Sequence, residues 1–144
     1  MKLNAWHIRE FQFPQDYEAV IDLWSHAGDG VHLGPSDTLD EIKKKLDYAP
    51  DLFLVAEKDG EIIGAVMGGF DGRRGLVYHL AVKQDYRRQG IASALMDELE
   101  KRFKQRGCLR AYLLVTRDNI EARDYYEKRG WVLMDILTYG KNFN

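Results

Sequence analysis

The chain has 144 residues, enough for one domain with a sizeable core, and its 45% hydrophobic and 31% charged content is ordinary for a globular protein. The 21 basic and 23 acidic residues give a net charge of −2, so there is no global electrostatic reason to expect nucleic acid as a partner. Cys108 is the only cysteine, which excludes an intrachain disulfide and a cysteine-based metal site.

No apolar run approaches the ~20 residues that a membrane-spanning helix needs. Residues 1–10 contain no apolar core of a secretory signal, and a lone cysteine suits a reducing compartment. We therefore expect a cytoplasmic protein with neither nucleic acid nor a membrane as its partner.

The periodicity of the hydrophobic residues predicts ten elements in the order β-α-α-β-β-β-α-β-α-β, without a linker or repeat. Their approximate ranges are 6–11, 14–27, 36–50, 52–57, 61–70, 76–83, 88–106, 110–115, 119–129 and 131–141. This order predicts an α+β fold, a three-layer α/β sandwich with a mixed central sheet and helices on both faces. We expect a single domain over residues 1–144.

Local turn and cap patterns support these boundaries. Thr38 and Glu41 have the spacing of a capping box at the start of the second helix. Asp59-Gly60 predicts a tight hairpin, and residues 71–75 predict a second turn, so three strands should form an antiparallel meander. The strand at 110–115 follows a helix, which favours a parallel neighbour for it.

Residues 77–95 predict a buried strand, a basic glycine turn and the start of a helix. Backbone N–H groups at a helix N-terminus, together with the helix dipole, form an anion site that most often takes phosphate. Arg87 and Arg88 add positive charge, and Gly90 and Ala92 allow close approach. We expect a phosphate-bearing ligand at 87–93; the alternative is a tight turn with surface arginines.

Two motifs together resemble the GCN5-related N-acetyltransferase superfamily, which uses acetyl-CoA. The first is Arg87-Arg88-Gln89-Gly90-Ile91-Ala92, and the second, about thirty residues on, is Asn119-x-x-Ala122-x-x-Tyr125-Tyr126-Glu127-Lys128-x-Gly130-Trp131. A glycine turn alone is common, but here both motifs stand in the family's order on the expected elements. The resemblance covers nearly the whole chain and implies direct acetyl transfer from acetyl-CoA to a primary amine, without a metal.

The resemblance also implies how acetyl-CoA is held. The strand before the turn would carry a bulge, and the pantetheine amides would pair with the backbone of Leu80 and Val82 like an added strand. A freed N–H near Leu80 would bind the thioester oxygen. Asn119 either bonds the pantetheine or only caps a helix. The expected cofactor-binding residues are Leu80, Ala81, Val82, Arg87, Arg88, Gln89, Gly90, Ile91, Ala92, Ser93 and Asn119.

The resemblance places a tyrosine near the sulfur, and here that position is Tyr126. A phenol can donate a proton to the leaving thiolate. The alternative is that Tyr126 is a core aromatic, the role that we assign to Tyr125 because adjacent helical residues point about 100° apart. Cys108 lies away from both motifs, which favours direct transfer over an acyl-enzyme.

The attacking amine must lose a proton, and His79 is the foremost candidate for the base. An imidazole can accept a proton near neutral pH, although a lone histidine on a strand is more often structural. A relayed water is a further alternative, and Glu57 and Asp71 are weaker candidates.

The family's acceptor specificity usually comes from the loop between the first two helices and from the last strands, here 24–36 and 131–140. The side chains that could line the amine site, or equally belong to a plain loop, are Trp24, His26, Asp29 and His32. Residues 131–140 leave no room for a long final hairpin, so one wall is either open or supplied by a second copy in a homodimer. Lysines 43–45 are more typical of a solvated face than of a binding site.

A protein with this sequence could also bind acetyl-CoA without catalysis, as a sensor or partner subunit. An assay of thiol release from acetyl-CoA in the presence of an amine separates the two hypotheses, because only an enzyme transfers the acetyl group to the amine.

Overall fold

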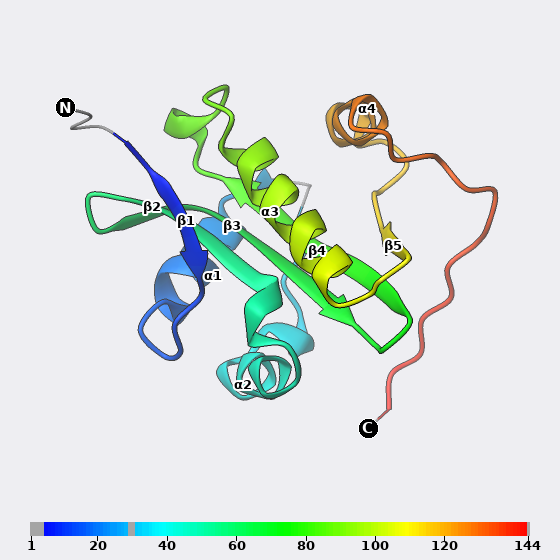
Figure 1. Cartoon of the computed structure of the whole chain (residues 1–144), viewed down its shortest axis with the longest axis horizontal. Helices are drawn as coiled ribbons and strands as arrows, with labels where there is room; N and C mark the ends of the chain where they lie inside the picture. Colours follow the sequence, from blue (N-terminus) through cyan, green and yellow to red (C-terminus); the bar gives the residue numbers. More distant parts are fainter. Residues whose placement is uncertain (1–4, 29–30, 144) are drawn as a thin grey trace. The chain divides into compact units, whose positions relative to one another are not determined.

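The computed structural model describes residues 5–28 and 31–143, and the chain divides into two compact units after Leu114. The first unit holds a five-stranded sheet in the order β1-β2-β3-β4-β5 (Figure 1). The strands are β1 His7–Glu10, β2 Phe53–Lys58, β3 Glu61–Phe70, β4 Arg74–Val82 and β5 Arg110–Leu113. β1 to β4 are antiparallel and β5 is parallel to β4, which confirms the meander and the mixed sheet.

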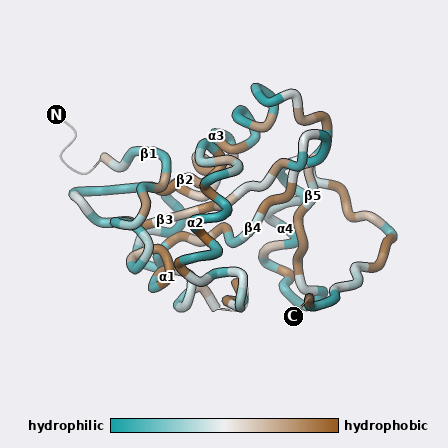
Figure 2. Tube along the Cα trace, turned by 90° about the horizontal axis from the view of Figure 1, so that it is seen from below, coloured by the Kyte–Doolittle hydropathy of each residue, from teal (hydrophilic) through white to brown (hydrophobic). Residues whose placement is uncertain are grey.

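Helices cover both faces of this sheet, as the sequence predicts. Figure 2 shows α3 on one side of the strands and α1 and α2 on the other. The helices of the first unit are α1 Tyr17–Ser25, α2 Leu39–Tyr48 and α3 Ile91–Gln105, with short 3₁₀ helices η2 Pro35–Asp37, η3 Pro50–Leu52 and η4 Gln84–Tyr86. Thr38 caps α2, because its hydroxyl accepts the N–H of Glu41.

The alternation of side chains along the strands explains the two layers. On the α1–α2 face, Phe53 stacks on Trp24, with ring centroids 5.7 Å apart, and both are buried. On the α3 face, a Cβ at Gly68 would lie 2.7 Å from Leu99 Cδ1, and one at Gly75 would lie 2.7 Å from Phe103 Cε1. Small residues on this face therefore let α3 pack directly against the sheet.

The β2–β3 connection is the tight hairpin that the sequence predicts. Lys58 pairs with Glu61 across Asp59 and Gly60, whose φ angles are +51° and +81°. Two consecutive positive φ values are those of a type I′ turn, for which Asp-Gly is a preferred pair.

β4 carries a bulge beside its centre. Ala65 pairs with Ala81 and Met67 pairs with Tyr78, so Val66 alone opposes two residues of β4, His79 and Leu80. His79 has φ +51°, a conformation that few non-glycine residues adopt. Because the extra residue shifts the alternation, Tyr78 and Ala81 both face α1 and α2, and His79 is turned with them. The bulge that the family resemblance implies is thus confirmed.

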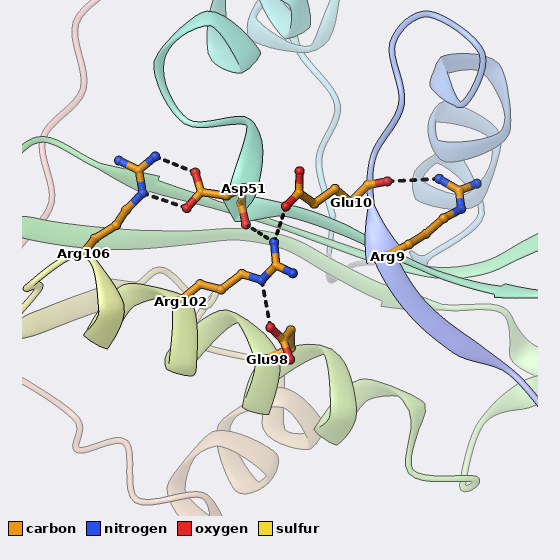
Figure 3. Close-up of polar contacts among 6 residues, drawn as sticks. All are labelled: Arg9, Glu10, Asp51, Glu98, Arg102 and Arg106. Atoms are coloured by element: carbon orange, nitrogen blue, oxygen red, sulfur yellow. Dashed lines mark hydrogen bonds and ion pairs between the residues drawn. The ribbon is translucent and has the colours of Figure 1, made fainter.

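An ion-pair network fastens α3 to the rest of the unit (Figure 3). The guanidinium of Arg102 donates to Glu98 at 2.8 Å, to Glu10 of β1 at 2.7 Å and to the carbonyl of Asp51 at 3.0 Å. Arg106 makes two bonds to the Asp51 carboxylate. These contacts join β1, η3 and the C-terminal half of α3.

The second unit contains α4, Ile120–Lys128, as expected, but the strand predicted over 131–141 is wrong. Residues 131–143 form no strand, and no other strand exists among residues 115–143 to supply a hydrogen-bonded partner in their own unit. The apolar side chains that suggested a strand are exposed: Val132, Leu133, Ile136, Leu137 and Tyr139. A suitable pattern does not form a strand without a ladder.

None of the helices that the structure describes is long and apolar enough to cross a membrane.

Candidate active site

Asp37 and His79 form a part-buried, hydrogen-bonded pair on the α1–α2 face of the sheet. His79 Nε2 lies 3.1 Å from Asp37 Oδ1, and the two side chains are 18% and 8% exposed. Asp37 ends η2, and His79 is in the bulge of β4. The residues are 42 positions apart in the sequence, so only the fold brings them together.

The surroundings hold this pair in one geometry. Asp37 Oδ2 accepts the backbone N–H of Gly34 at 3.0 Å, and the Asp37 carbonyl accepts the hydroxyl of Tyr17 at 2.8 Å. The ring of Trp24 lies edge-on to His79, with centroids 4.8 Å apart. The loop before η2 therefore holds the carboxylate, α1 holds the backbone of Asp37 through Tyr17, and Trp24 packs against the imidazole.

The direction of the hydrogen bond determines what His79 can do. A carboxylate only accepts, so His79 Nε2–H donates to Asp37. In a neutral imidazole the other nitrogen, Nδ1, then carries the lone pair. His79 is thus presented as a proton acceptor through Nδ1.

A cavity of about 550 Å³ opens onto the pair, a volume within the usual range for small-molecule sites. Loop residues before α2, among them His32, lie on one side. α2 contributes Lys45 and Tyr48, and the sheet contributes Met67, Phe70 and Tyr78. Burial raises the pKa of Tyr78, so its hydroxyl stays protonated at neutral pH. The cavity is apolar and aromatic along the sheet and polar at Asp37–His79.

The edge of β4 is open where the sequence places the cofactor. β5 pairs with β4 only over Arg74–Val77. Leu80, Ala81 and Val82 lie beyond the end of that ladder, and no strand among residues 5–28 and 31–143 pairs with them on the β5 side. An extended ligand could add here as a strand does, immediately after His79.

The turn between β4 and α3 has the geometry of an anion site. Arg88 and Gly90 have φ angles of +64° and +83°, left-handed values of the kind found in anion-binding backbone turns. The side chains of Arg87, Arg88 and Gln89 are exposed, and Arg87 Nε donates to the Val82 carbonyl at 3.3 Å. A Cβ built at Gly90 would meet nothing within 4 Å, so the space beside this residue is open.

The first turn of α3 follows directly after Gly90, whose carbonyl accepts the N–H of Ala94 at 2.9 Å. Ala92 and Ser93 are half-buried there. Ile91 is buried against Gly64 of β3, so its side chain belongs to the core and only its backbone can face a ligand.

Tyr126 and Asn119 belong to α4 in the second unit. Burial raises the pKa of Tyr126 to about 12, with Tyr125 adding to the effect and Arg129 opposing it. The phenol therefore stays protonated at neutral pH, as a proton donor must. Asn119 caps α4, because its Oδ1 accepts the N–H of Ala122 at 3.2 Å.

The other candidates have structural partners. Glu57 accepts from Arg9 at 3.0 Å, Asp71 accepts two N–H groups of its turn, and Cys108 Sγ donates to the Arg110 carbonyl. His26 is exposed and contacts the Asp22 carbonyl. Asp29 lies outside the described residues.

Sequence reasoning missed two residues of the site, Asp37 and Lys45. The sequence places Asp37 only within the predicted helix 36–50, and it favours a solvated face for Lys45. Lys43 and Lys44 are exposed as predicted, but Lys45 lines the cavity and is only partly exposed. Its distinguishing feature is its position one turn after the buried Ile42, at i+3 on the inner face of α2.

The mixed sheet with a bulged central strand, the basic glycine turn before α3 and the cavity beside the bulge agree with the class of CoA-dependent acyltransferases. The chain belongs to the acetyltransferase (GNAT) family, whose model matches residues 6–131. It is 47% identical over 127 residues to an acetyltransferase of Pectobacterium atrosepticum, covering 88% of both chains. It is 45% identical over 136 residues to one of Sodalis glossinidius, covering 93% of both.

Solved structures agree with the fold. Ard1 from Thermoplasma volcanium has a TM-score of 0.79 at 29% identity, over 90% of this chain and 84% of that one. The PaiA N-acetyltransferase from Thermoplasma acidophilum, solved with coenzyme A, has a TM-score of 0.78 at 22% identity, over 92% of both chains. The protein is an acetyl-CoA-dependent N-acetyltransferase. The described residues contain no group of three or more His, Cys, Asp or Glu that could hold a metal.

Proposed function

We propose that the cavity at Asp37–His79 binds a primary amine and that His79 takes its proton. The observation that carries this proposal is the bulge of β4, which turns His79 toward the cavity and is followed at once by the open edge at Leu80–Val82. The base and the expected position of the thioester are thus consecutive along one strand. That proximity is the first requirement for transfer between two bound molecules.

The cofactor lies, in this proposal, along β4 and the turn that follows. The backbone of Leu80 and Val82 pairs with the pantetheine arm, and an N–H freed by the bulge binds the thioester oxygen. The N–H groups of residues 88–93 and the charges of Arg87 and Arg88 hold the pyrophosphate. The positive φ of Arg88 and the open side of Gly90 support this assignment.

The proposed reaction uses two protein groups, one that accepts a proton and one that donates a proton. His79 Nδ1 accepts a proton from the amine, whose nitrogen forms a bond to the acetyl carbon. The bond from that carbon to sulfur breaks, and the Tyr126 hydroxyl gives a proton to the thiolate. The raised pKa of Tyr126 supports a phenol that is protonated before transfer. Asp37 acts through His79 as a positioning residue, and Asn119 has its helix cap as an established role.

The experiment measures free thiol with acetyl-CoA and a panel of primary amines. We expect thiol release that depends on an amine and an acetylated product of equal amount. Release without an amine would indicate hydrolysis only. Tight binding of acetyl-CoA with no release for any amine would instead support a non-catalytic sensor or partner subunit.

We further propose that residues 1–144 act as one cytoplasmic domain. We also propose that a second copy of the chain, in a homodimer, completes the wall of the amine-binding site. The exposed apolar side chains of 132–139 support a contact with another chain. Light scattering during size-exclusion chromatography tests the homodimer. A monomer at the concentration used for activity would contradict the homodimer, and one wall of the amine-binding site would then be open to solvent.

A further inference from the structure

The cavity beside His79 has a second charged group, Lys45 of α2. Its side chain is only partly exposed, unlike those of Lys43 and Lys44 on the same helix. No carboxylate among residues 5–28 and 31–143 lies within ion-pair distance of it, although Lys44 pairs with Glu41 nearby. Lys45 is therefore a cation that lines the cavity without an ion-pair partner among the described residues.

The charged groups around Lys45 agree with a lysine that has no ion-pair partner among the described residues. Burial and, to a smaller extent, the charge of Arg106 lower its pKa to about 8, with Asp51 opposing the change. Asp51 is already bonded to Arg106 through both carboxylate oxygens. At neutral pH the lysine still carries its proton, and an anion bound beside it would stabilise the charged form.

The two polar groups of the cavity lie at different places along α2. Asp37 directly precedes the N-cap Thr38, and Lys45 is seven residues beyond that cap. A helix rises 1.5 Å per residue, so the two positions are separated by about 10 Å along the axis, less the reach of the lysine side chain. Met67, Phe70 and Tyr78 of the sheet lie along the same cavity and present apolar and aromatic surface.

We propose that the acceptor is a primary amine that carries a carboxylate at the far end of an apolar or aromatic skeleton, and that Lys45 binds this carboxylate. The inference rests on the proposed function, since it places the amine at His79. An α-amino acid is too short, because one carbon separates its two charges. A dipeptide spans about 7 Å and fits, as does an ω-amino acid of similar length.

The test compares acids with matched neutral amines. The probes are Gly-Phe and Gly-Phe amide, and 7-aminoheptanoate and heptylamine, each assayed for kcat/KM with saturating acetyl-CoA. We expect the acid of a pair to be favoured by about tenfold or more, as for a charge-assisted bond. Preference within the first pair identifies a peptide acceptor, and preference within the second alone identifies an ω-amino acid.

Three variants test whether Lys45 causes the preference for an acid over the matched neutral amine. Lys45→Met should bring the ratio of acid to neutral amine close to one, and Lys45→Arg should retain it. Lys43→Met is the matched control, because Lys43 is exposed on the same helix, and its ratio should equal that of the wild type.

Binding provides a readout that does not need turnover. With coenzyme A present, titration calorimetry of the same four probes should show tighter binding of an acid to the wild type than to Lys45→Met. Transfer to amines with equal preference for acid and neutral probes would overturn this inference and leave the proposed function intact. Absence of both transfer and any difference in binding would overturn both.

Discussion

Two clusters of charged side chains in the first unit serve different ends. Asp37 and His79 form a single pair on the α1–α2 face, open to a cavity on one side. On the α3 face, Arg102 contacts Glu10, Glu98 and the Asp51 carbonyl (Figure 3). The network bonds one guanidinium to three acceptors, whereas His79 bonds to Asp37 through Nε2 and also lines the cavity. The network therefore contributes to the fold, and the pair is the candidate for chemistry.

The backbone beneath the two clusters differs as well. Arg102 lies in the regular helix α3, but His79 has a positive φ, which costs on the order of 1–3 kcal/mol for a non-glycine residue. Exposed ion pairs each contribute about 0.2–1 kcal/mol. The fold thus tolerates strain at the cavity and gains modest stability at the network, so mutations in the two regions should affect different properties.

The largest effect is expected from His79→Asn. Asparagine tolerates a positive φ, so the bulge should survive while the base is lost. Amine-dependent kcat should fall by about 10³-fold, the scale of a lost general base. Steady-state kinetics and a denaturation curve measure activity and folding separately. His26→Asn, at an exposed position on α1, is the control, and equal kinetics in the two variants would exclude His79 as the base.

Tyr126→Phe should lower kcat by about 10²-fold with little change in acetyl-CoA affinity, because only the proton for the thiolate is lost. Tyr125→Phe is the matched control on the next position of α4. Since the pKa of Tyr126 is about 12, the wild type should show no loss of kcat from phenol ionisation between pH 7 and about 10. An unchanged rate in Tyr126→Phe would remove the phenol from the reaction.

Gly90→Val tests the turn that lies between the strand and α3. A valine there should weaken acetyl-CoA binding by about tenfold, since its side chain fills the open space beside the N–H groups. Gly107→Val is a close control, because Gly107 has φ +79° and equally open surroundings beyond the other end of α3. Both variants should lose about 1–2 kcal/mol of stability from the strained φ. Equal acetyl-CoA affinity in both would contradict a pyrophosphate site at Gly90.

Lys45 lines the cavity and is also affected by the charge of Arg106, and its titration should change the free energy of unfolding with pH. Its pKa is about 8 when folded against an ordinary 10.5, so the unfolded chain binds more protons between these values. The unfolding free energy should therefore rise with pH from about 8 to 10.5, by about 1–2 kcal/mol once partial exposure is allowed for. Denaturation at several pH values should show this rise in the wild type. A rise of the same size in Lys45→Met would contradict it.

Much of the fold follows from local sequence. Asp59-Gly60 and Thr38 specify a hairpin and a cap through their own backbone and side chains, which a sequence pattern captures. The prediction of the final strand is wrong because a strand depends on more than its local sequence. The apolar residues of 131–141 satisfy the pattern, but a strand also needs a partner, and no pattern supplies one.

The same distinction applies to the site. The turn at Arg87–Gly90 is contiguous, so the sequence predicts it. Asp37 and His79 meet only because a bulge turns one strand residue toward a loop 42 positions earlier. The sequence identifies the histidine but not its carboxylate partner, since that contact depends on the packing of α1 and α2 against the sheet.

The smallest effect is expected from Arg102→Met, and it completes the comparison. Methionine keeps the aliphatic part of the side chain, while Glu10, Glu98 and the Asp51 carbonyl lose their donor. Because these acceptors are near solvent, stability should fall by only about 1 kcal/mol. The kcat and the KM for acetyl-CoA should stay at wild-type values, since the β4 bulge and the α3 N-terminus are untouched. Urea denaturation beside steady-state kinetics measures both, and Arg102→Lys should recover part of the stability. A drop in kcat without unfolding would show that the network also positions the site.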